Sequence, residues 1–304
     1  VALTGFPQCR LPFRSSDLSY LDHIHACNNA NLSRYARFRI GTRPVGALRS
    51  EFATALTALG DDFIRDENGE YGFASHIQTV AERNAALTNA TEALRDQGTI
   101  KRLHGEKFDI RNCLSDAPLC QLDRFAMPHF GCRSWGVHMN GFVRKADGLH
   151  MWIAHRAQDK PTYPGMLDNM VAGGQPTGLG FRENMIKECA EEAGIPQEIS
   201  QKVIPIGTVS YLYETDEGLK PDVMVNFDLE LPESFVPQCA DGEVERFELL
   251  PLEDVAEIVR TGFDFKFNCA LVVIDFLIRH GHLTADNEPT YCELVSGLHR
   301  DLNP

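Results

Sequence analysis

The sequence has no long apolar run. No stretch approaches the roughly 18 consecutive apolar residues that a membrane-spanning helix needs, so we expect no membrane partner. Residues 1–14 contain no basic region followed by an apolar core, which predicts that there is no secretory signal peptide. The nine cysteines include no Cys-x-x-Cys pair, which argues against a zinc ribbon. Their odd number and irregular spacing favour reduced thiols, and we therefore predict a cytoplasmic protein.

Positive charge is also scarce. The chain has 29 lysines and arginines against 43 aspartates and glutamates, which gives a net charge of −14. This balance disfavours broad electrostatic binding to nucleic acid or to an anionic membrane, and we expect no nucleic-acid partner. A phosphorylated small molecule is still compatible with the charge, because a bound metal ion reverses its sign locally.

The chain lacks internal repeats and low-complexity segments, and its 304 residues are enough for two domains. Helical and strand patterns in the first part predict a smaller α/β domain over residues 1–130. From residue 134 the pattern changes to apolar strands before and after a central helix, which predicts a mixed α/β sandwich over residues 131–304. The sequence is silent on oligomeric state, so a homodimer is left open.

Apolar periodicity places the individual elements. Helices are predicted over residues 16–31, 49–59, 76–97, 183–193, 252–261 and 268–280. Strands are predicted over residues 35–45, 135–143, 149–155, 169–172, 204–213, 223–231 and 245–250. A hairpin is expected at residues 62–75, because Asn68-Gly69 supplies a turn with positive φ.

A glycine-rich turn followed by an acidic helix is the most informative segment. Residues 173–178 read Gly-Gly-Gln-Pro-Thr-Gly, and residues 183–194 read Glu-Asn-Met-Ile-Lys-Glu-Cys-Ala-Glu-Glu-Ala-Gly. Glu188, Glu191 and Glu192 stand at i, i+3 and i+4, where like charges repel and cost stability. Divalent metal ions would offset that cost, and Mg²⁺ is usually held by a few carboxylates plus substrate phosphates.

The same helix has an apolar arc on nearly the opposite side. That arc comprises Met185, Ile186, Cys189, Ala190 and Ala193. One face is therefore predicted to pack on the core and the other to bind ions. Lys187 follows Glu183 by four residues, which predicts a pair across one helical turn that fixes the loop against the helix.

The segment resembles the Nudix hydrolase signature, Gly-x5-Glu-x7-Arg-Glu-U-x-Glu-Glu-x-Gly-U, in which U is aliphatic. Gly173 aligns with the first glycine, and the family's metal positions align with Glu188, Glu191 and Glu192. The resemblance implies Mg²⁺ or Mn²⁺ at these glutamates.

Two positions depart from the signature. Lys187 stands where arginine is usual, and Leu179 stands where the first glutamate is usual. In the family these two residues pair as scaffold, so the departures affect the expected loop geometry more than the metal positions. The pair of Glu183 with Lys187 would be a relocated version of the same brace.

A narrower resemblance extends through residues 136–141, 160–169, 171–174, 228–232, 241–245 and 275–281. These segments look like the Nudix proteins related to thiamine pyrophosphokinase, and the first part of the chain looks like the accessory domain that precedes Nudix in that group. The resemblance implies a Nudix α/β/α sandwich with a mixed sheet. It also implies hydrolysis of a small organic diphosphate to monophosphate and phosphate. Members of the group are associated with thiamine diphosphate and its oxidised analogues.

The attacking water needs a carboxylate to position or deprotonate it. The candidates are Glu192, Glu191 and Glu243, the last of which follows the turn Asp241-Gly242. Nudix enzymes often place a further ligand or base in a loop downstream of the helix, and residues 214–218 are a rival location.

Substrate contacts are predicted in the segment before the glycine turn and in the turn itself. Arg156 and Lys160 could bind the terminal phosphate, while Gly173 and Gly174 allow the backbone to approach closely. The aromatic candidates for stacking on an organic ring are Trp135, Tyr163, Tyr211 and Tyr213.

Three further polar residues are interpreted as structural. His138 is expected to be a hydrogen-bonded core histidine, Cys189 to pack in the core, and Asp168 to brace the turn at residues 164–165.

Two other functions are left open. Lys187 and Leu179 are compatible with a catalytically silent diphosphate-binding module. Isopentenyl diphosphate isomerases share the Nudix fold, but they need a reactive cysteine, and no cysteine in the sequence stands beside a clear acid partner.

Overall fold

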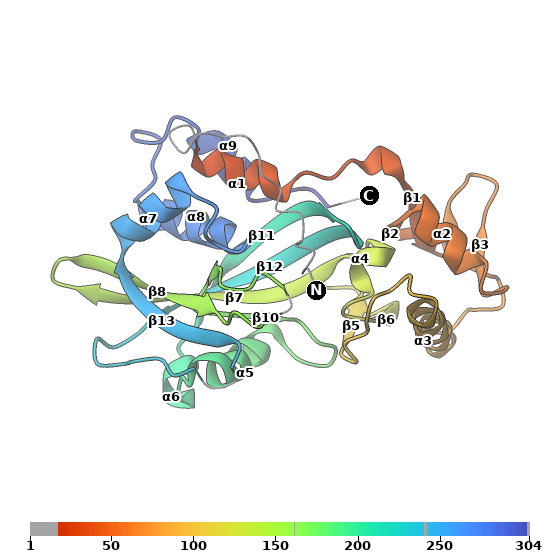
Figure 1. Ribbon diagram of the computed structural model, residues 1–304, viewed down its shortest axis with the longest axis horizontal. Coiled ribbons are helices and arrows are strands. Elements are labelled where there is room, and N and C mark those ends of the chain that lie inside the picture. The colour runs from red at the N-terminus through yellow and green to blue at the C-terminus, as the bar shows by residue number, and fades with distance from the viewer. Residues whose placement is uncertain (1–17, 161, 240–241, 303–304) are drawn as a thin grey trace, which may run out of the picture.

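A mixed seven-stranded sheet lies at the centre of the molecule (Figure 1). The computed structural model describes residues 18–160, 162–239 and 242–302. Outside them lie the segment 1–14 with Cys9, the first two residues of the helix predicted at 16–31, and Asp241. The strand order is β11-β12-β7-β8-β13, with β10 paired to β7 and β9 to β8. The strands are β7 (Ser134–Lys145), β8 (Gly148–Arg156), β9 (Leu167–Asp168), β10 (Val171–Gly174), β11 (Ile204–Thr215), β12 (Gly218–Glu230) and β13 (Val244–Pro251). Within this sheet only β7 and β12 pair in parallel, among the described strands.

Helices cover both faces of this sheet, which makes the α/β/α sandwich that the sequence predicted (Figure 1). One face carries α5 (Phe181–Ala193) and α6 (Gln197–Ser200). The other face carries α1 (Tyr20–Cys27), α7 (Leu252–Thr261), α8 (Cys269–Arg279) and α9 (Tyr291–Gly297).

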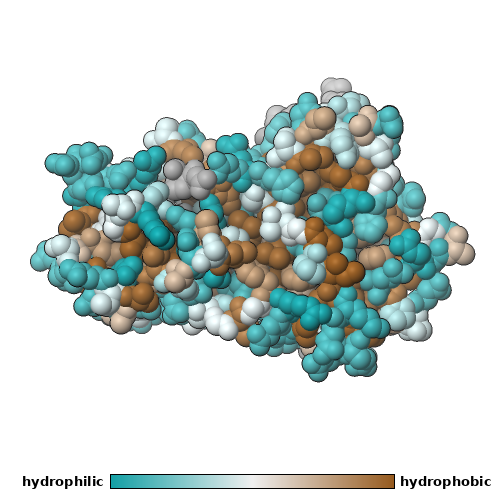
Figure 2. All heavy atoms as spheres, turned by 180° about the vertical axis from the view of Figure 1, so that it is seen from behind, coloured by the Kyte–Doolittle hydropathy of each residue, from teal (hydrophilic) through white to brown (hydrophobic). Residues whose placement is uncertain are grey.

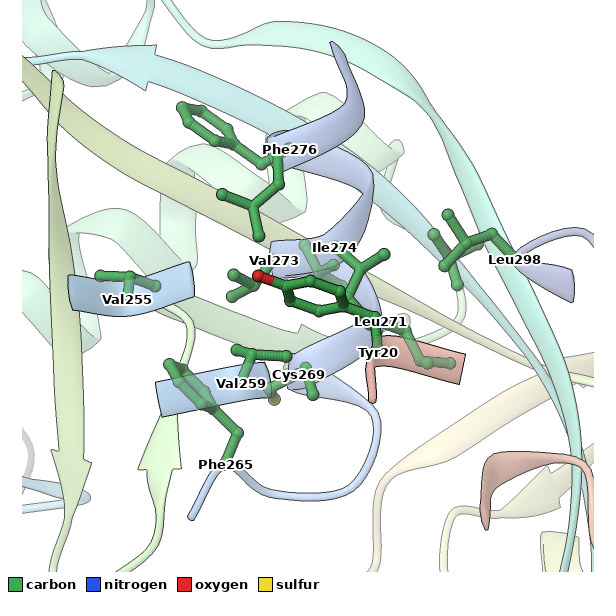
Figure 3. Packing of buried hydrophobic residues seen from close by; sticks show 14 of the residues in the cluster. Tyr20, Val255, Val259, Phe265, Cys269, Leu271, Val273, Ile274, Phe276 and Leu298 are labelled. Carbon is green, nitrogen blue, oxygen red and sulfur yellow. The ribbon is translucent and has the colours of Figure 1, made fainter. Parts of the chain in front are cut away.

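The strongly apolar α8 is the centre of the largest core cluster. Leu271, Val273 and Ile274 are fully buried, and Figure 3 shows them around the ring of Tyr20. The Tyr20 hydroxyl donates to the carbonyl of Ala256 at 3.1 Å, so its polar end is satisfied. Each large apolar side chain buried in this way contributes about 1.5–3 kcal/mol. As a result α1, which is early in the sequence, packs into the sandwich.

The N-terminal region forms two smaller sheets. The four-stranded sheet contains β1 (Tyr35–Ile40), β2 (Arg43–Arg49), β3 (Phe63–Arg65) and β4 (Tyr71–Phe73), in the order β2-β1-β4-β3. The two-stranded sheet pairs β5 (Lys107–Ile110) with β6 (Cys120–Asp123). The helices are η1 (Leu32–Arg34), α2 (Ser50–Thr57), α3 (Val80–Asp96) and α4 (Met127–Phe130).

The hairpin predicted at residues 62–75 is confirmed, with Gly69 at φ +79° in its turn. The single strand predicted over residues 35–45 is wrong. It is an antiparallel pair, because the chain reverses between β1 and β2 at Gly41, where φ is +61°. The predicted domain boundary at residue 130 stays a prediction.

Glu214 joins the N-terminal region to the sandwich. Its carboxylate accepts hydrogen bonds from Arg34 at 2.8 Å and from Arg49 at 2.9 Å. Burial alone would raise the pKa of Glu214, but the hydrogen bond from the Asn31 amide at 3.1 Å, together with these two arginines, lowers it. The rival carboxylate loop of the sequence analysis therefore lies in a contact between the two regions.

No helix in the described part of the chain is long and apolar enough to span a bilayer. On the face seen in Figure 2, hydrophilic side chains separate the apolar ones into several patches.

Candidate active site

The acidic helix α5 begins two residues earlier than predicted and ends as predicted. Its N-cap is Gly180, whose amide lies 3.5 Å from the carboxylate of Glu183. Gly194 closes the helix at φ +61°, a left-handed conformation that glycine adopts at little cost. The local signals in the sequence were therefore sufficient to place this helix.

The buried face of α5 is rotated from the predicted one. Met185, Cys189 and Ala193 are fully buried as predicted, but Ala190 is exposed. Asn184 and Glu192 take its place in the buried face, with exposed fractions of 0% and 9%. The reason is that β10 lies along this side of the helix, and the amide of Ala172 in β10 donates to Glu192 Oε2 at 2.9 Å.

The three helix glutamates consequently have different surroundings. The side chain of Glu191 is 51% exposed and that of Glu188 is 15% exposed. Lys187 Nζ lies 2.5 Å from Glu191 Oε2 and 3.5 Å from Glu188 Oε1. The predicted pair of Lys187 with Glu183 is therefore wrong: Glu183 faces the helix start, and Lys187 is drawn to two carboxylates at once.

Burial raises the pKa of Glu192 well above its usual range, and repulsion from Asp168, Glu188 and Glu243 adds to the shift. Burial also raises the pKa of Glu188, although Lys187 opposes it. The folded chain thus holds carboxylates where their charged form is penalised, and a divalent cation with oxygen ligands would remove that penalty.

The backbone of the glycine turn closes tightly on these carboxylates. A Cβ atom at Gly173 would lie 2.5 Å from Glu188 Cδ, so only glycine fits there without displacing the glutamate. A Cβ at Gly174 would lie 2.5 Å from Phe108 Cζ. Both glycines therefore permit close packing, on opposite sides of the turn. The carboxylates of Glu188 and Glu192 offer the oxygen ligands that a divalent metal ion prefers, but among the described residues the group whose potential ligand atoms gather within 4.8 Å is another one.

Glu243 lies on the same side of the site as the helix glutamates. It is close enough to Glu192 to contribute to the raised pKa of that residue. Its Oε2 is 2.7 Å from Lys160 Nζ, and its carbonyl accepts from the amide of Ala157 at 3.0 Å. The structure therefore brings Glu243 and Lys160 together, and Lys160 is ion-paired.

Arg156 braces the segment that follows β8. Its Nε donates to the carbonyl of Tyr163 at 3.0 Å, its Nη2 to that of Thr162 at 2.9 Å, and its Nη1 to Asp168 at 2.8 Å. Tyr163 has φ +51°, which is uncommon for a residue other than glycine and costs free energy that such contacts offset. Asp168 reaches this segment through Arg156, and the bracing of the turn at residues 164–165 that the sequence predicted for it stays a prediction.

Lys266 is a site residue that the sequence analysis missed. Its amide donates to the carbonyl of Leu167 at 2.8 Å, and its Nζ is 3.7 Å from Asp168 Oδ2. Burial lowers its pKa, but attraction to Asp168 and Glu192 outweighs burial, and the net shift is upward. The ammonium group therefore stays charged near the buried glutamates. No motif marked Lys266, because it lies far along the chain from Asp168, its ion-pair partner.

His138, Asp168 and Cys269 also gather, with one potential ligand atom from each lying within 4.8 Å of the others. This set does not fit a metal ion, because Arg156 and Lys266 already neutralise Asp168. Burial would raise the pKa of Asp168, but these two cations lower it to about 2. Burial likewise raises the pKa of Cys269, so its thiol stays protonated.

Cys269 also corrects the expectation that no cysteine has an acid partner. Its Sγ donates to Asp168 Oδ1 at 2.6 Å. The thiol is nevertheless fully buried, and its pKa is raised well above the usual range. Reactive cysteines have lowered pKa values and some exposure, so this contact does not support the isomerase alternative.

His138 is buried as predicted, and from its burial we expect that acid lowers the stability of the fold. Its Nδ1 lies 2.9 Å from Asn169 Oδ1, and burial, reinforced by Lys266 and opposed by Asp168, lowers its pKa to about 4. Because protonation then favours the unfolded state, stability should fall as the pH drops from 6.5 towards 4, by about 3 kcal/mol from this group. Denaturant unfolding of the wild type and of His138→Gln across this range measures the difference in slope.

The control for that measurement is a substitution of the exposed His25 by Gln, which should leave the slope unchanged. Equal slopes in the wild type and His138→Gln would contradict the assignment.

The aromatic candidates separate into two groups. Tyr211 is 1% exposed, and Trp135 packs edge-on against Phe181, so both are structural. Tyr163 and Tyr213 are partly exposed and gather at Phe267, with ring centres 5.3 and 4.5 Å from it. Phe267 follows Lys266 directly in the chain.

Known proteins show clear similarity to this chain. The model of a family described as "Domain of unknown function (DUF4743)" matches residues 19–134. "Nudix hydrolase 20, chloroplastic" of Arabidopsis thaliana is 38% identical over 300 residues, which cover 95% of this chain and 80% of that protein. "Nudix hydrolase 24, chloroplastic" of the same plant is 35% identical over 292 residues, with the same two coverages. Among solved structures, DR0079 from Deinococcus radiodurans has a TM-score of 0.43 and 21% identity, and covers 55% of this chain and 97% of its own.

Proposed function

The chain belongs to the Nudix hydrolase family, and from this premise we propose that it hydrolyses the diphosphate linkage of thiamine diphosphate or an oxidised analogue, with Mg²⁺ or Mn²⁺ held by Glu188, Glu191 and Glu192. The observation that carries the metal assignment is the buried Glu192, whose carboxylate has a raised pKa beside Glu188 and Glu243. The expected cytoplasmic location stays a prediction, since both relatives are named as chloroplastic.

The bound cation would supply positive charge that stabilises the charge developing on the phosphate oxygens. The chain's own groups then position the reactants. The ammonium group of Lys266 provides a fixed positive charge near Glu192. The oxygen of a water molecule attacks phosphorus, and the bridging P–O bond breaks. The bridging oxygen leaves with one product, which gives monophosphate and phosphate.

The proton of the attacking water passes to a carboxylate oxygen. Glu243 is our candidate for this step, with Glu191 and Glu192 as the alternatives. Its side chain is 48% exposed and hence open to water, and Lys160 holds it from one side. Glu192, by contrast, has its Oε2 hydrogen-bonded to the Ala172 amide in the buried face of α5, which suits a ligand.

Two observations support an aromatic organic group on the substrate. Tyr163, Tyr213 and Phe267 form a partly exposed group of rings, and Tyr213 stacks on Phe267 with an interplanar angle of 22°. Lys266 precedes Phe267 in the chain, and Arg156 donates a hydrogen bond to the carbonyl of Tyr163. Aromatic faces beside cations suit a molecule that has a planar ring at one end and a diphosphate at the other. A thiazolium ring would gain further from its own positive charge.

A substrate panel tests the proposal. Thiamine diphosphate, its oxo analogue, ADP and isopentenyl diphosphate are each incubated with the protein and Mg²⁺, Mn²⁺ or EDTA, and released phosphate is measured. We expect metal-dependent release from the thiamine compounds and the highest kcat/KM among the panel for one of them. Release from ADP alone would contradict the substrate assignment. Calorimetric binding of all four without any release would favour the silent binding module.

A further inference from the structure

The glycine loop, residues 173–180, lacks the Glu–Arg brace of the common Nudix signature. Leu179 cannot form an ion pair, and Lys187 is bound to Glu191. Part of the support comes from within: Gln175 Nε2 donates to the carbonyl of Leu179 at 2.8 Å, and Asn184 Nδ2 donates to that of Gly174 at 2.8 Å. These bonds fix the two ends of the loop, and the support of its middle, at Thr177, comes from elsewhere.

The outer side is held by the N-terminal region. We call strands β5 and β6 the β5–β6 arm, and Figure 1 shows it beside the loop that leads into α5. The amide of Thr177 donates to the carbonyl of Lys107 at 2.9 Å. The Thr177 hydroxyl donates to Asp109 Oδ1 at 2.6 Å and accepts from Gln121 Nε2 at 2.7 Å. One threonine thus makes three hydrogen bonds to the arm.

Packing and charge reinforce these hydrogen bonds. The ring of Phe108 lies so close to Gly174 that a Cβ there would be 2.5 Å from its Cζ. The guanidinium of Arg124 stands 5.6 Å from the centre of the Phe108 ring. Arg124 also attracts Glu188 and so opposes the rise in the pKa of that glutamate. The arm therefore touches the loop, and Arg124, the residue directly after β6, acts electrostatically on a proposed metal ligand.

We propose that the β5–β6 arm takes the place of the missing brace, with Thr177, Asp109 and Gln121 as positioning residues that keep Gly173 against Glu188. This inference rests on the proposed hydrolase function of the same site. It gives the N-terminal region a definite role: it supports the loop from outside the Nudix sandwich, where the common signature supports it from within.

Thr177→Val is the direct test, because it keeps the side-chain shape and removes both hydroxyl hydrogen bonds. A reacting group displaced by about 1 Å costs roughly a hundredfold in rate, so we expect kcat with the best diphosphate of the panel to fall about tenfold to a hundredfold. Peptides covering residues 173–180 should also exchange their amide hydrogens faster. The melting temperature should change little, because Thr177 is only partly buried.

Restoring the signature pair provides the decisive arm of the experiment. Leu179→Glu with Lys187→Arg should recover most of the lost kcat in the Thr177→Val background, and should slow the exchange of residues 173–180 again. The same pair in the wild-type background is the reference against which this recovery is measured. Recovery would not be expected if Thr177 only stabilised the fold. Thr54→Val, which removes a hydroxyl within the exposed part of α2, is the matched control.

Two results with Thr177→Val would contradict the proposal. Wild-type kcat and wild-type exchange in Thr177→Val would overturn the proposal, and so would a lowered kcat that the restored pair does not recover. If the wild type hydrolyses no diphosphate, the proposed function fails, and the exchange rates still report whether the arm holds the loop.

Discussion

Replacing Glu192 with glutamine should lower kcat by about a thousandfold and leave the fold intact. The magnitude is that of losing a charged group that acts directly on the reacting centre. The physical reason is that glutamine cannot supply the negative charge that a buried metal ion needs, although it can still accept the hydrogen bond from Ala172. Steady-state kinetics at several Mg²⁺ concentrations measures the effect.

The thermal stability of metal-free Glu192→Gln should not fall together with its activity. Burial raises the pKa of Glu192. In the metal-free protein the carboxylate therefore destabilises the fold increasingly as the pH rises above the ordinary pKa of a glutamate. The Glu192→Gln protein should therefore melt no lower than the wild type at pH 7.5 in EDTA. Glu198→Gln on the exposed side of α6 is the matched control and should keep full activity. Undiminished turnover in Glu192→Gln would refute its assignment to the metal site.

Gly173→Ala should be nearly as damaging, for a steric reason. The added methyl group would lie 2.5 Å from Glu188 Cδ, a separation that real Cβ atoms essentially never show. Either Glu188 or the strand must move, and a displacement of about 1 Å in an active site costs roughly a hundredfold in rate. We expect kcat/KM to drop by about that factor, together with weaker activation by Mg²⁺.

Gly180→Ala is the matched control, since it lies in the same loop and a Cβ there meets no atom within 4 Å. It should lose roughly 0.5–1 kcal/mol of stability as a poorer N-cap, and no activity. If Gly173→Ala and Gly180→Ala had the same kinetics, the close contact with Glu188 would have no functional role.

The sequence by itself determined the features that depend on near neighbours along the chain. The apolar periodicity of residues 252–261 and 268–280 predicted α7 and α8 to within one residue at each end. Gly194 placed the end of α5, and the spacing of Glu188, Glu191 and Glu192 indicated metal chemistry before any fold was known. Caps, turns and helical periods are local properties, so a linear pattern is enough to reveal them.

The tertiary structure alone decided which charges meet. It rotated α5 so that Glu192 is buried and Ala190 is exposed, because the neighbouring β10 selects the face that packs. It joined Lys266 to Asp168 across about a hundred residues of sequence, and Thr177 to the β5–β6 arm. It also gave Lys187 a different carboxylate partner from the predicted one. Such contacts form between segments distant in sequence, and their partners are fixed only when sheets and helices pack in three dimensions.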